Sequence, residues 1–257
     1  MSKQSKRDRQ RENREARRQY EEQLARRRRM FKTARTLAFI LVPVLAVGVF
    51  LSISSDDDST DGKENAAVAA GCRAAKKPAP KSGDFTEPAP TITDLTKTYV
   101  ATVDTSCGSF TIQLAGGEAP ETVNSFAFLA NERFYDGLTF HRLVKDFVIQ
   151  GGDPSGDGTG GPGYTVPDEP PANGYQVGSV AMANSGPGTT GSQFFVVTTD
   201  EGAANLGGPP FLYSILGQVT EGLETVLRIE SLAKDNQQPR AVVVIDKVTV
   251  TEAPAAP

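Results

Sequence analysis

A 20-residue stretch without a charged side chain, TLAFILVPVLAVGVFLSISS, divides this 257-residue chain between Arg35 and Asp56. As a helix it would be about 30 Å long, which matches the hydrocarbon core of a bilayer. Residues 1–35 hold 14 Lys and Arg against 5 Asp and Glu, whereas the rest of the chain is acidic. Because Lys and Arg collect on the cytoplasmic side of a span, the sequence predicts a single transmembrane helix over 36–55. The N-terminus is then expected in the cytoplasm and the remainder outside the membrane.

Other interpretations of this region stay open. A cleaved signal peptide usually has a shorter apolar core that ends at a small-residue cleavage site. A lipid-anchored exported protein is suggested by Ala69-Ala70-Gly71-Cys72, although an acidic stretch separates this box from the apolar run. The basic segment 1–35 could bind nucleic acid, as basic arms do. We expect instead a solvated cytoplasmic segment that contacts anionic lipid, with no nucleic-acid partner.

Beyond the span, the composition changes twice. Residues 56–93 are rich in Asp, Ala, Pro and Lys without apolar periodicity, which predicts a disordered linker. From about Asp94, short apolar runs alternate with Gly, Pro and Asn turns, a pattern typical of all-β domains. Eight strands are predicted, at 98–105, 108–114, 138–143, 146–151, 178–184, 193–198, 214–219 and 242–250.

Two helices interrupt these strands. One begins at Pro120, a favourable first-turn residue, and carries an apolar stripe at helical spacing. The other follows Gly222. The sequence therefore predicts a mainly β domain over 94–253, an eight-stranded antiparallel closed β-barrel capped by two α-helices, followed by a short tail at 254–257.

The two cysteines, Cys72 and Cys107, both lie on the predicted exported side. An oxidising compartment favours a disulfide between them. The enclosed loop of about 35 residues would contribute roughly 4 kcal/mol to stability in a chain-entropy description. Two independent free thiols are the alternative.

Several kinds of catalytic site are unsupported by the residue types. His141 is the one histidine, and the chain has no Cys-x-x-Cys pair and no Gly-x-Ser-x-Gly elbow. The stretch 156–161 fits Gly-x-Gly-x-x-Gly, but Pro162 follows it rather than a helix, so a dinucleotide site is not indicated. We therefore expect neither a metal nor a cofactor.

Polar and aromatic side chains do gather in two apolar segments, 140–153 and 180–197. Together they would form a shallow, mostly apolar site with a few directed hydrogen-bond donors. Such a site is better suited to binding and twisting a chain than to breaking bonds. Its candidate members are His141, Arg142, Gln150, Asn184, Gln193 and Phe195.

Five blocks in these and neighbouring segments resemble the cyclophilin signature. They occur in the family's order and spacing, and the resemblance extends over about residues 96–250. The blocks are Phe140-His141-Arg142-Leu143, Phe147-Val148-Ile149-Gln150-Gly151-Gly152-Asp153, Gly158-Thr159-Gly160-Gly161, Ser179-Val180-Ala181-Met182-Ala183-Asn184 and Gly191-Ser192-Gln193-Phe194-Phe195. The resemblance implies peptidyl-prolyl cis-trans isomerase activity without a cofactor.

The resemblance also implies roles for individual residues. Arg142 matches the catalytic arginine, Gln150 the glutamine that helps to position it, and His141 lies at the site's edge. Peptide-binding roles fall on an apolar wall for the proline ring, a backbone strip and a groove glutamine. The implied apolar wall is formed by Phe147, Val148 and Phe195. The implied backbone strip is formed by Ala183 and Asn184, and the groove glutamine is Gln193.

Part of the pocket departs from the family pattern. The chain contains no tryptophan, the loop 199–213 is longer than usual, and Tyr213 stands where many members have histidine. Val148 replaces a common methionine. Leu206, Phe211 or Leu212 is expected to complete the pocket.

The expected partners are proline-containing peptides and unfolded exported proteins, bound by a monomer. A non-catalytic module that holds proline-containing clients at the cell envelope is the alternative function.

Overall fold

The structure is a computed structural model that describes residues 60–81, 85–94 and 96–253. The chain separates into two compact units, and all of the described residues belong to the second unit, Asp57–Pro257. The predicted transmembrane helix 36–55, the basic segment 1–35 and the tail 254–257 lie outside the described residues. Within them, no helix combines the length and apolar character needed to cross a bilayer.

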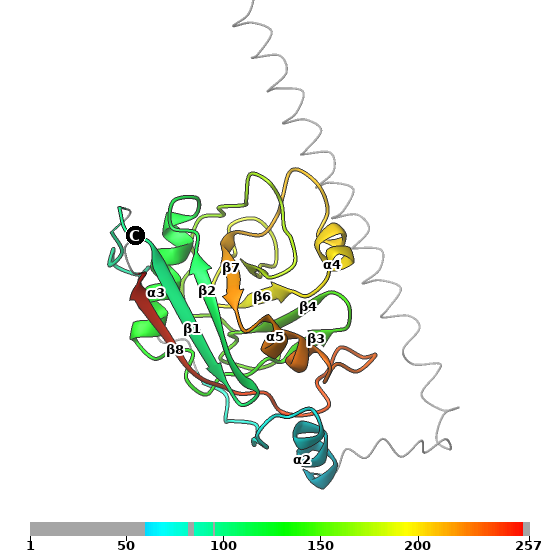
Figure 1. Cartoon of the computed structure of the whole chain (residues 1–257). Helices are drawn as coiled ribbons and strands as arrows, with labels where there is room; N and C mark the ends of the chain where they lie inside the picture. Colours follow the sequence, from blue (N-terminus) through cyan, green and yellow to red (C-terminus); the bar gives the residue numbers. More distant parts are fainter. Residues whose placement is uncertain (1–59, 82–84, 95, 254–257) are drawn as a thin grey trace, which may run out of the picture. The chain divides into compact units, whose positions relative to one another are not determined.

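All eight predicted strands have counterparts, although the strand predicted at 138–143 is observed only at Arg142–Val144. In chain order they are β1 (Tyr99–Thr105), β2 (Gly108–Leu114), β3 (Arg142–Val144), β4 (Val148–Gly151), β5 (Ser179–Met182), β6 (Phe194–Val197), β7 (Ile215–Glu221) and β8 (Ile245–Glu252). They form one antiparallel sheet in the order β3-β4-β6-β5-β7-β2-β1-β8, which curves through the domain in Figure 1. The mainly β fold is therefore confirmed.

The prediction of a closed barrel is wrong, because the end strands β3 and β8 do not pair with each other. β3 is only three residues long. Its Leu143 N–H donates to the carbonyl of Gln237, in the loop before β8, at 3.0 Å. Just before β3, an isolated bridge joins Thr139 to Val244. The sheet is a half-barrel: β3 and β8 are not paired, but the segment before β3 is hydrogen-bonded to the start of β8, for example from the N–H of Ile245 to Leu138 O at 2.7 Å.

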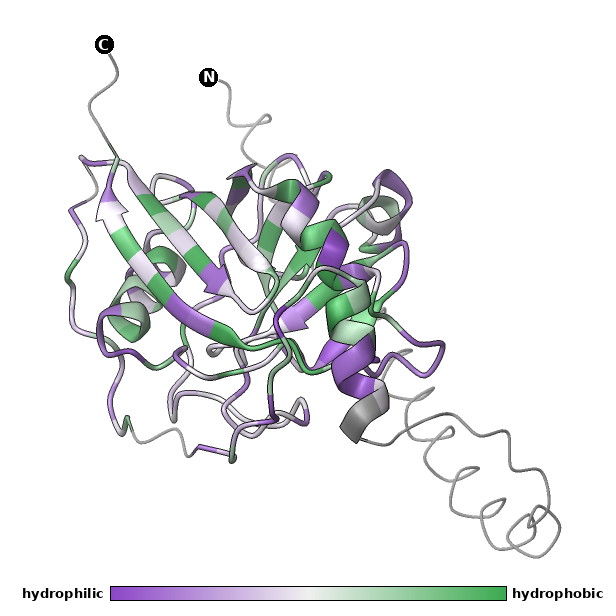
Figure 2. Ribbon diagram, turned by 60° about the horizontal axis from the view of Figure 1, so that its bottom comes forward, coloured by the Kyte–Doolittle hydropathy of each residue, from purple (hydrophilic) through white to green (hydrophobic). Residues whose placement is uncertain are grey.

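The two predicted helices, α3 (Pro120–Asn131) and α5 (Leu223–Glu230), are confirmed. α3 begins with Pro120 in its first turn, as expected for a ring that fixes φ. Its buried face, including Val123 and Phe126, packs in the main hydrophobic core with the inward residues of the sheet. Those inward residues alternate with more polar ones along the long strands, visible as alternating colours in Figure 2.

The segment predicted as a disordered linker, 56–93, is ordered where the structure describes it. Helix α2 (Thr60–Ala69) is followed by a disulfide between Cys72 and Cys107, which confirms the predicted pair. Both cysteines are buried in the main core. The expectation of disorder is wrong here because composition does not reveal that Cys72 ties the segment to the β1–β2 turn.

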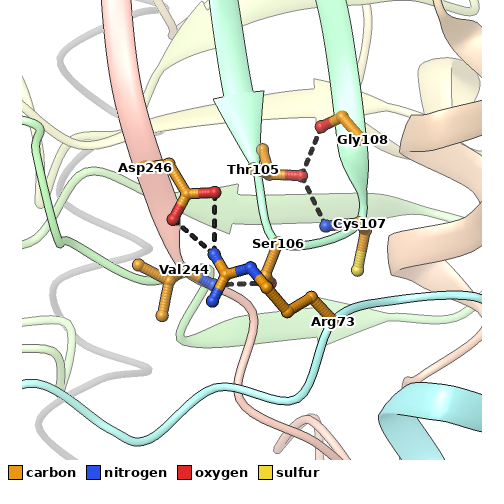
Figure 3. A network of polar contacts seen from close by, with 7 residues as sticks. All are labelled: Arg73, Thr105, Ser106, Cys107, Gly108, Val244 and Asp246. Carbon is orange, nitrogen blue, oxygen red and sulfur yellow. Dashed lines mark hydrogen bonds and ion pairs between the residues drawn. The ribbon is translucent and has the colours of Figure 1, made fainter.

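Polar contacts continue this attachment (Figure 3). The N–H of Arg73 donates to Ser106 O at 2.7 Å, and its guanidinium forms an ion pair with Asp246 at 2.6 Å. In the adjoining turn, Thr105 Oγ1 accepts from the N–H of Cys107 at 3.0 Å. The segment after α2 is thus joined to both the β1–β2 turn and β8.

Candidate active site

Four residues of the site lie side by side across four strands. Arg142 of β3 is directly opposite Gln150 of β4, which is opposite Phe195 of β6, which is opposite Ala181 of β5. Residues directly opposite one another share a face of the sheet. The register therefore brings a cation, an amide, an aromatic ring and a methyl group into one row.

The neighbours of these residues point the other way. The residue after Arg142 and the residues before Gln150 and Phe195 are fully buried in the main core. These residues are Leu143, Ile149 and Phe194. Because side chains alternate between faces, the core anchors the strands from behind. The row itself lies on the outer face, where Arg142 and Gln150 are partly exposed and Phe195 and Ala181 are buried in a second, smaller cluster.

The guanidinium of Arg142 is held by amide side chains. Its Nη1 donates to Gln150 Oε1 at 3.2 Å, and its Nε donates to Gln237 Oε1 at 2.8 Å. Gln150 Nε2 in turn donates to Gln193 Oε1 at 3.0 Å, and Gln193 Nε2 donates to the carbonyl of Gly160 at 2.9 Å. A continuous chain of hydrogen bonds therefore links the arginine to the glycine-rich loop.

Partial burial lowers the pKa of Arg142, while the nearby Tyr213 opposes the shift. A guanidinium titrates so far above neutrality that it keeps its charge. Both amide acceptors are neutral, so the positive charge is oriented without being paired to a carboxylate. The group remains available to donate strong hydrogen bonds to a ligand.

An apolar wall stands beside the arginine. Its buried centre consists of Val148, Ala181, Phe195 and Val197. Partly buried residues pack against this centre, among them Phe147, Ala183, Leu206 and Tyr213. The rings of Phe195 and Tyr213 meet edge-to-face with centroids 5.2 Å apart. The structure thus brings together all of the predicted apolar residues.

A cavity of about 500 Å³ shares Ala183 with this wall and is otherwise lined mostly by polar residues and glycines, among them Gln150, Gln193, Asn184 and the glycine-rich loop. The N–H of Ala183 donates to Gln193 O at 2.8 Å. Asn184 Nδ2 donates to the carbonyl of Leu212 at 2.8 Å. The side chain of Asn184 therefore fixes the loop that carries Tyr213, in addition to lining the cavity.

His141 is not brought together with the other predicted residues. It lines a separate cavity of about 170 Å³ with Phe140, Lys77 and Gly156. Burial lowers the pKa of the imidazole, partly opposed by the carboxylate of Asp153. The ring is therefore neutral at pH 7.

The loop 199–213 contains a short helix, α4 (Asp200–Asn205), that the sequence did not predict. Thr199 caps it by accepting the N–H of Gly202 at 2.9 Å. Leu206 follows the helix and contributes to the wall, as does Tyr213. Of the alternatives considered for completing the pocket, Leu206 is thus the one that joins the wall.

Two residues that hold the site by hydrogen bonds were missed. The hydroxyl of Tyr175 donates to the carbonyl of Tyr213 at 2.7 Å and accepts its N–H at 3.0 Å, which holds that wall residue by its backbone. Gln237, the second partner of Arg142, lies 95 positions away in the sequence. Neither residue stands in a motif or a periodic segment, so no local signal identified them.

Comparison with known proteins decides the family. The family model described as "Cyclophilin type peptidyl-prolyl cis-trans isomerase/CLD" matches residues 100–250, which is more than half of the chain. The chain belongs to the cyclophilin family. It is a cyclophilin-type peptidyl-prolyl cis-trans isomerase.

Two curated cyclophilins illustrate the relationship. "Peptidyl-prolyl cis-trans isomerase B" of Bacillus subtilis is 51% identical over 108 residues, covering 41% of this chain and 72% of the relative. "Peptidyl-prolyl cis-trans isomerase A" of Mycobacterium tuberculosis is 39% identical over 177 residues, covering 60% of this chain and 93% of the relative. The similarity thus extends over most of each relative.

Solved structures agree with this assignment. A cyclophilin of Cryptosporidium parvum matches with a TM-score of 0.55 at 28% identity, covering 61% of this chain and 99% of that one. A second structure of that protein, determined in the presence of the dipeptide Ala-Pro, matches with a TM-score of 0.53 at 28% identity, covering 59% of this chain and 98% of that one.

The described part of the present cyclophilin contains no group of three or more His, Cys, Asp or Glu side chains that could hold a metal ion.

Proposed function

We propose that this cyclophilin accelerates X–Pro rotation by holding the proline ring against its apolar wall while Arg142 stabilises the twisted imide. A peptide bond resists rotation because resonance gives its C–N bond partial double-bond character, with a barrier of about 18–20 kcal/mol. An X–Pro bond therefore exchanges over tens to hundreds of seconds. Catalysis requires interactions that are stronger in the twisted state than in either planar state.

A hydrogen-bond donor aimed at the prolyl nitrogen meets that requirement. In the planar imide the nitrogen lone pair is delocalised, and in the twisted state it becomes available to accept. The guanidinium of Arg142 would donate to it there, and each 1.4 kcal/mol of preference gives about a tenfold increase in rate. The proline ring stays against Phe195 and Val148 while the preceding residue swings.

The observation that carries this proposal is the row Arg142–Gln150–Phe195, which places an oriented cation beside an apolar wall. No covalent chemistry is needed, and the site offers donors rather than a nucleophile. The Ala-Pro dipeptide in the related solved structure supports a proline-containing ligand. We infer that the clients are extended, proline-containing segments.

The test is the full-length chain with Arg142→Ala in a proline-peptide isomerisation assay. We expect kcat/KM to fall by about 10²–10³, the usual effect of removing one preorganised donor. Arg73→Ala is the matched control, because Arg73 is an exposed arginine paired with Asp246 and outside the site. Wild-type rates for Arg142→Ala would contradict the mechanism, and binding without acceleration in the wild type would favour a binding module.

We also propose that the isomerase domain works outside the cytoplasm, as a monomer tethered by residues 36–55. The Cys72–Cys107 disulfide supports export, since disulfides persist in oxidising compartments. It also occupies the sulfur that lipid anchoring through Cys72 would need. Added protease should cleave the domain from intact cells, with a cytoplasmic protein as the control. A domain that is cut only after lysis would contradict this topology.

A further inference from the structure

The loop between α5 and β8 is closed on itself by backbone contacts. The N–H of Gln237 donates to Lys234 O at 2.9 Å, and Ala233 and Pro239 form an isolated antiparallel bridge. The carbonyl of Gln237 accepts the N–H of Leu143, in β3, at 3.0 Å. The loop therefore occupies the edge of the sheet next to β3 and holds Gln237 in register with the strand that carries Arg142.

The backbone of Gln237 has a φ of +65°, in the left-handed region. Residues other than Gly, Asn and Asp rarely adopt this backbone conformation, and such strain often accompanies a functional constraint. Glycine or asparagine would relieve the backbone but lack the reach of a glutamine side chain. Here that reach is used: Gln237 Oε1 accepts the Nε–H of Arg142 at 2.8 Å.

The geometry of the guanidinium explains what this contact does. The group is planar and carries five N–H donors in a fixed arrangement. A single hydrogen bond to Gln150, at 3.2 Å, would leave its plane free to turn about that bond. A second bond to Gln237, from a different segment of the chain, fixes the plane. Neither bond uses Nη2, whose two hydrogens lie in the plane that these two bonds fix.

We propose that Gln237 is a positioning residue of the isomerase, which orients the plane of Arg142 toward the rotating imide. The inference rests on the proposed role of Arg142. Because rotational catalysis depends on where the donor points, misplacement by about 1 Å can reduce the rate by about a hundredfold. Substrate binding, which depends on the apolar wall, should change little.

The test compares kcat and KM for the full-length chain with Gln237→Gly, Gln237→Glu and Gln238→Ala. Gln237→Gly keeps the positive φ without strain and removes the acceptor, so we expect kcat to fall about 10- to 100-fold with KM within about twofold. Gln237→Glu keeps an acceptor on a side chain of the same length, so kcat should stay above that of Gln237→Gly even though the carboxylate pairs with the guanidinium. Gln238→Ala alters the neighbouring exposed amide, and should leave both constants unchanged.

Two further measurements separate this inference from the mechanism it rests on. In an Arg142→Lys background, Gln237→Gly should produce no additional loss, because the group it orients is gone. The Nε–Hε NMR resonance of Arg142 should shift in Gln237→Gly and stay in place in Gln238→Ala. A positioning role for Gln237 is excluded if Gln237→Gly keeps wild-type kcat, raises only KM, or lowers kcat equally in the Arg142→Lys background. If Arg142→Ala itself keeps wild-type activity, the proposed mechanism fails instead.

Discussion

The two faces of the sheet at β6 carry adjacent phenylalanines with different uses. Phe194 is fully buried, and its ring lies 5.9 Å in edge-to-face contact from each of three aromatic rings, those of Phe126, Tyr135 and Phe140. Phe195, one position later, belongs to the small cluster with Val148 and Tyr213 on the outer face. Helix α3 contributes to the cover over the first face, whereas loops contribute to the cover over the second. Hydrophobicity takes both rings out of water, and the proposed mechanism assigns only Phe195, on the outer face, to the substrate.

The largest expected difference between the faces comes from shortening each phenylalanine. Phe194→Ala should lower the free energy of unfolding by about 3–5 kcal/mol, because it leaves a cavity among rigid aromatic neighbours. Phe195→Ala should lower it less and instead reduce kcat/KM by roughly tenfold to a hundredfold. That loss corresponds to the approximately 1.5–3 kcal/mol gained when an apolar side chain packs against its partner.

Urea unfolding and the isomerase assay, made on both variants at equal folded concentration, measure the two effects. If Phe195→Ala proved as destabilising as Phe194→Ala and as active as the wild type, the outer face would be ordinary core. The comparison between the faces would then be wrong.

The disulfide provides a second test of the difference between the core face and the outer face of the sheet. Cys72 and Cys107 pack in the main cluster and do not belong to the cluster around Phe195. Changing both to serine should lower the free energy of unfolding by about 2–4 kcal/mol, because the unfolded chain regains the freedom of a loop that the disulfide had closed. The value of kcat/KM per folded molecule should stay within about twofold of the wild type.

Thermal unfolding with and without a thiol reductant supplies the measurement. The wild type should lose stability on reduction, and the double serine variant should be insensitive to the reductant. If the double serine variant also lost kcat/KM at temperatures where it remains folded, the disulfide would affect the outer face. The conclusion that the two faces are independent would then be wrong.

Most of the site residues were predictable because the resemblance marked them, whereas strand alternation alone left their facing open. Once the resemblance marked Arg142 and Gln150, their pairing across a hairpin placed them on one face. The contributions of Tyr175 and Gln237 were not predictable, because irregular loops bring them to the site from 38 and 95 positions away in sequence. What identifies these two residues is a hydrogen bond to a partner far away in the sequence, and that bond forms only when the chain folds.

The errors about the fold have the same origin. Strand count and pattern suggested closure, but closure depends on the pairing of the two edges, and a three-residue β3 meets the loop of Gln237 instead of β8. The composition of 56–93 suggested disorder, but the Cys72–Cys107 bond and the contacts of Arg73 hold part of that segment against the sheet. Long-range contacts decided both cases.

His141 provides the smallest and most discriminating test of the comparison. The resemblance put it at the edge of the catalytic site, but it lines a separate cavity and its imidazole pKa is lowered by burial. The unfolded chain therefore binds the proton more readily than the folded chain as the pH falls below about 6.5. Stability should consequently decrease as the pH falls through this region, with a slope of at most about 1.4 kcal/mol per pH unit for one proton.

His141→Gln should remove that component of the pH dependence of unfolding, because glutamine does not titrate. If His141 belongs with the core, kcat/KM should show the same pH dependence in the variant and the wild type, since the charge on Arg142 does not change over this range. A pH step in kcat/KM that disappears in His141→Gln would instead make the histidine part of the outer face. Both the free energy of unfolding and kcat/KM should be measured from about pH 5 to 8, a range that includes the ordinary histidine pKa. A change only in the pH dependence of unfolding assigns His141 to the core, and a change in the pH dependence of kcat/KM assigns it to the outer face.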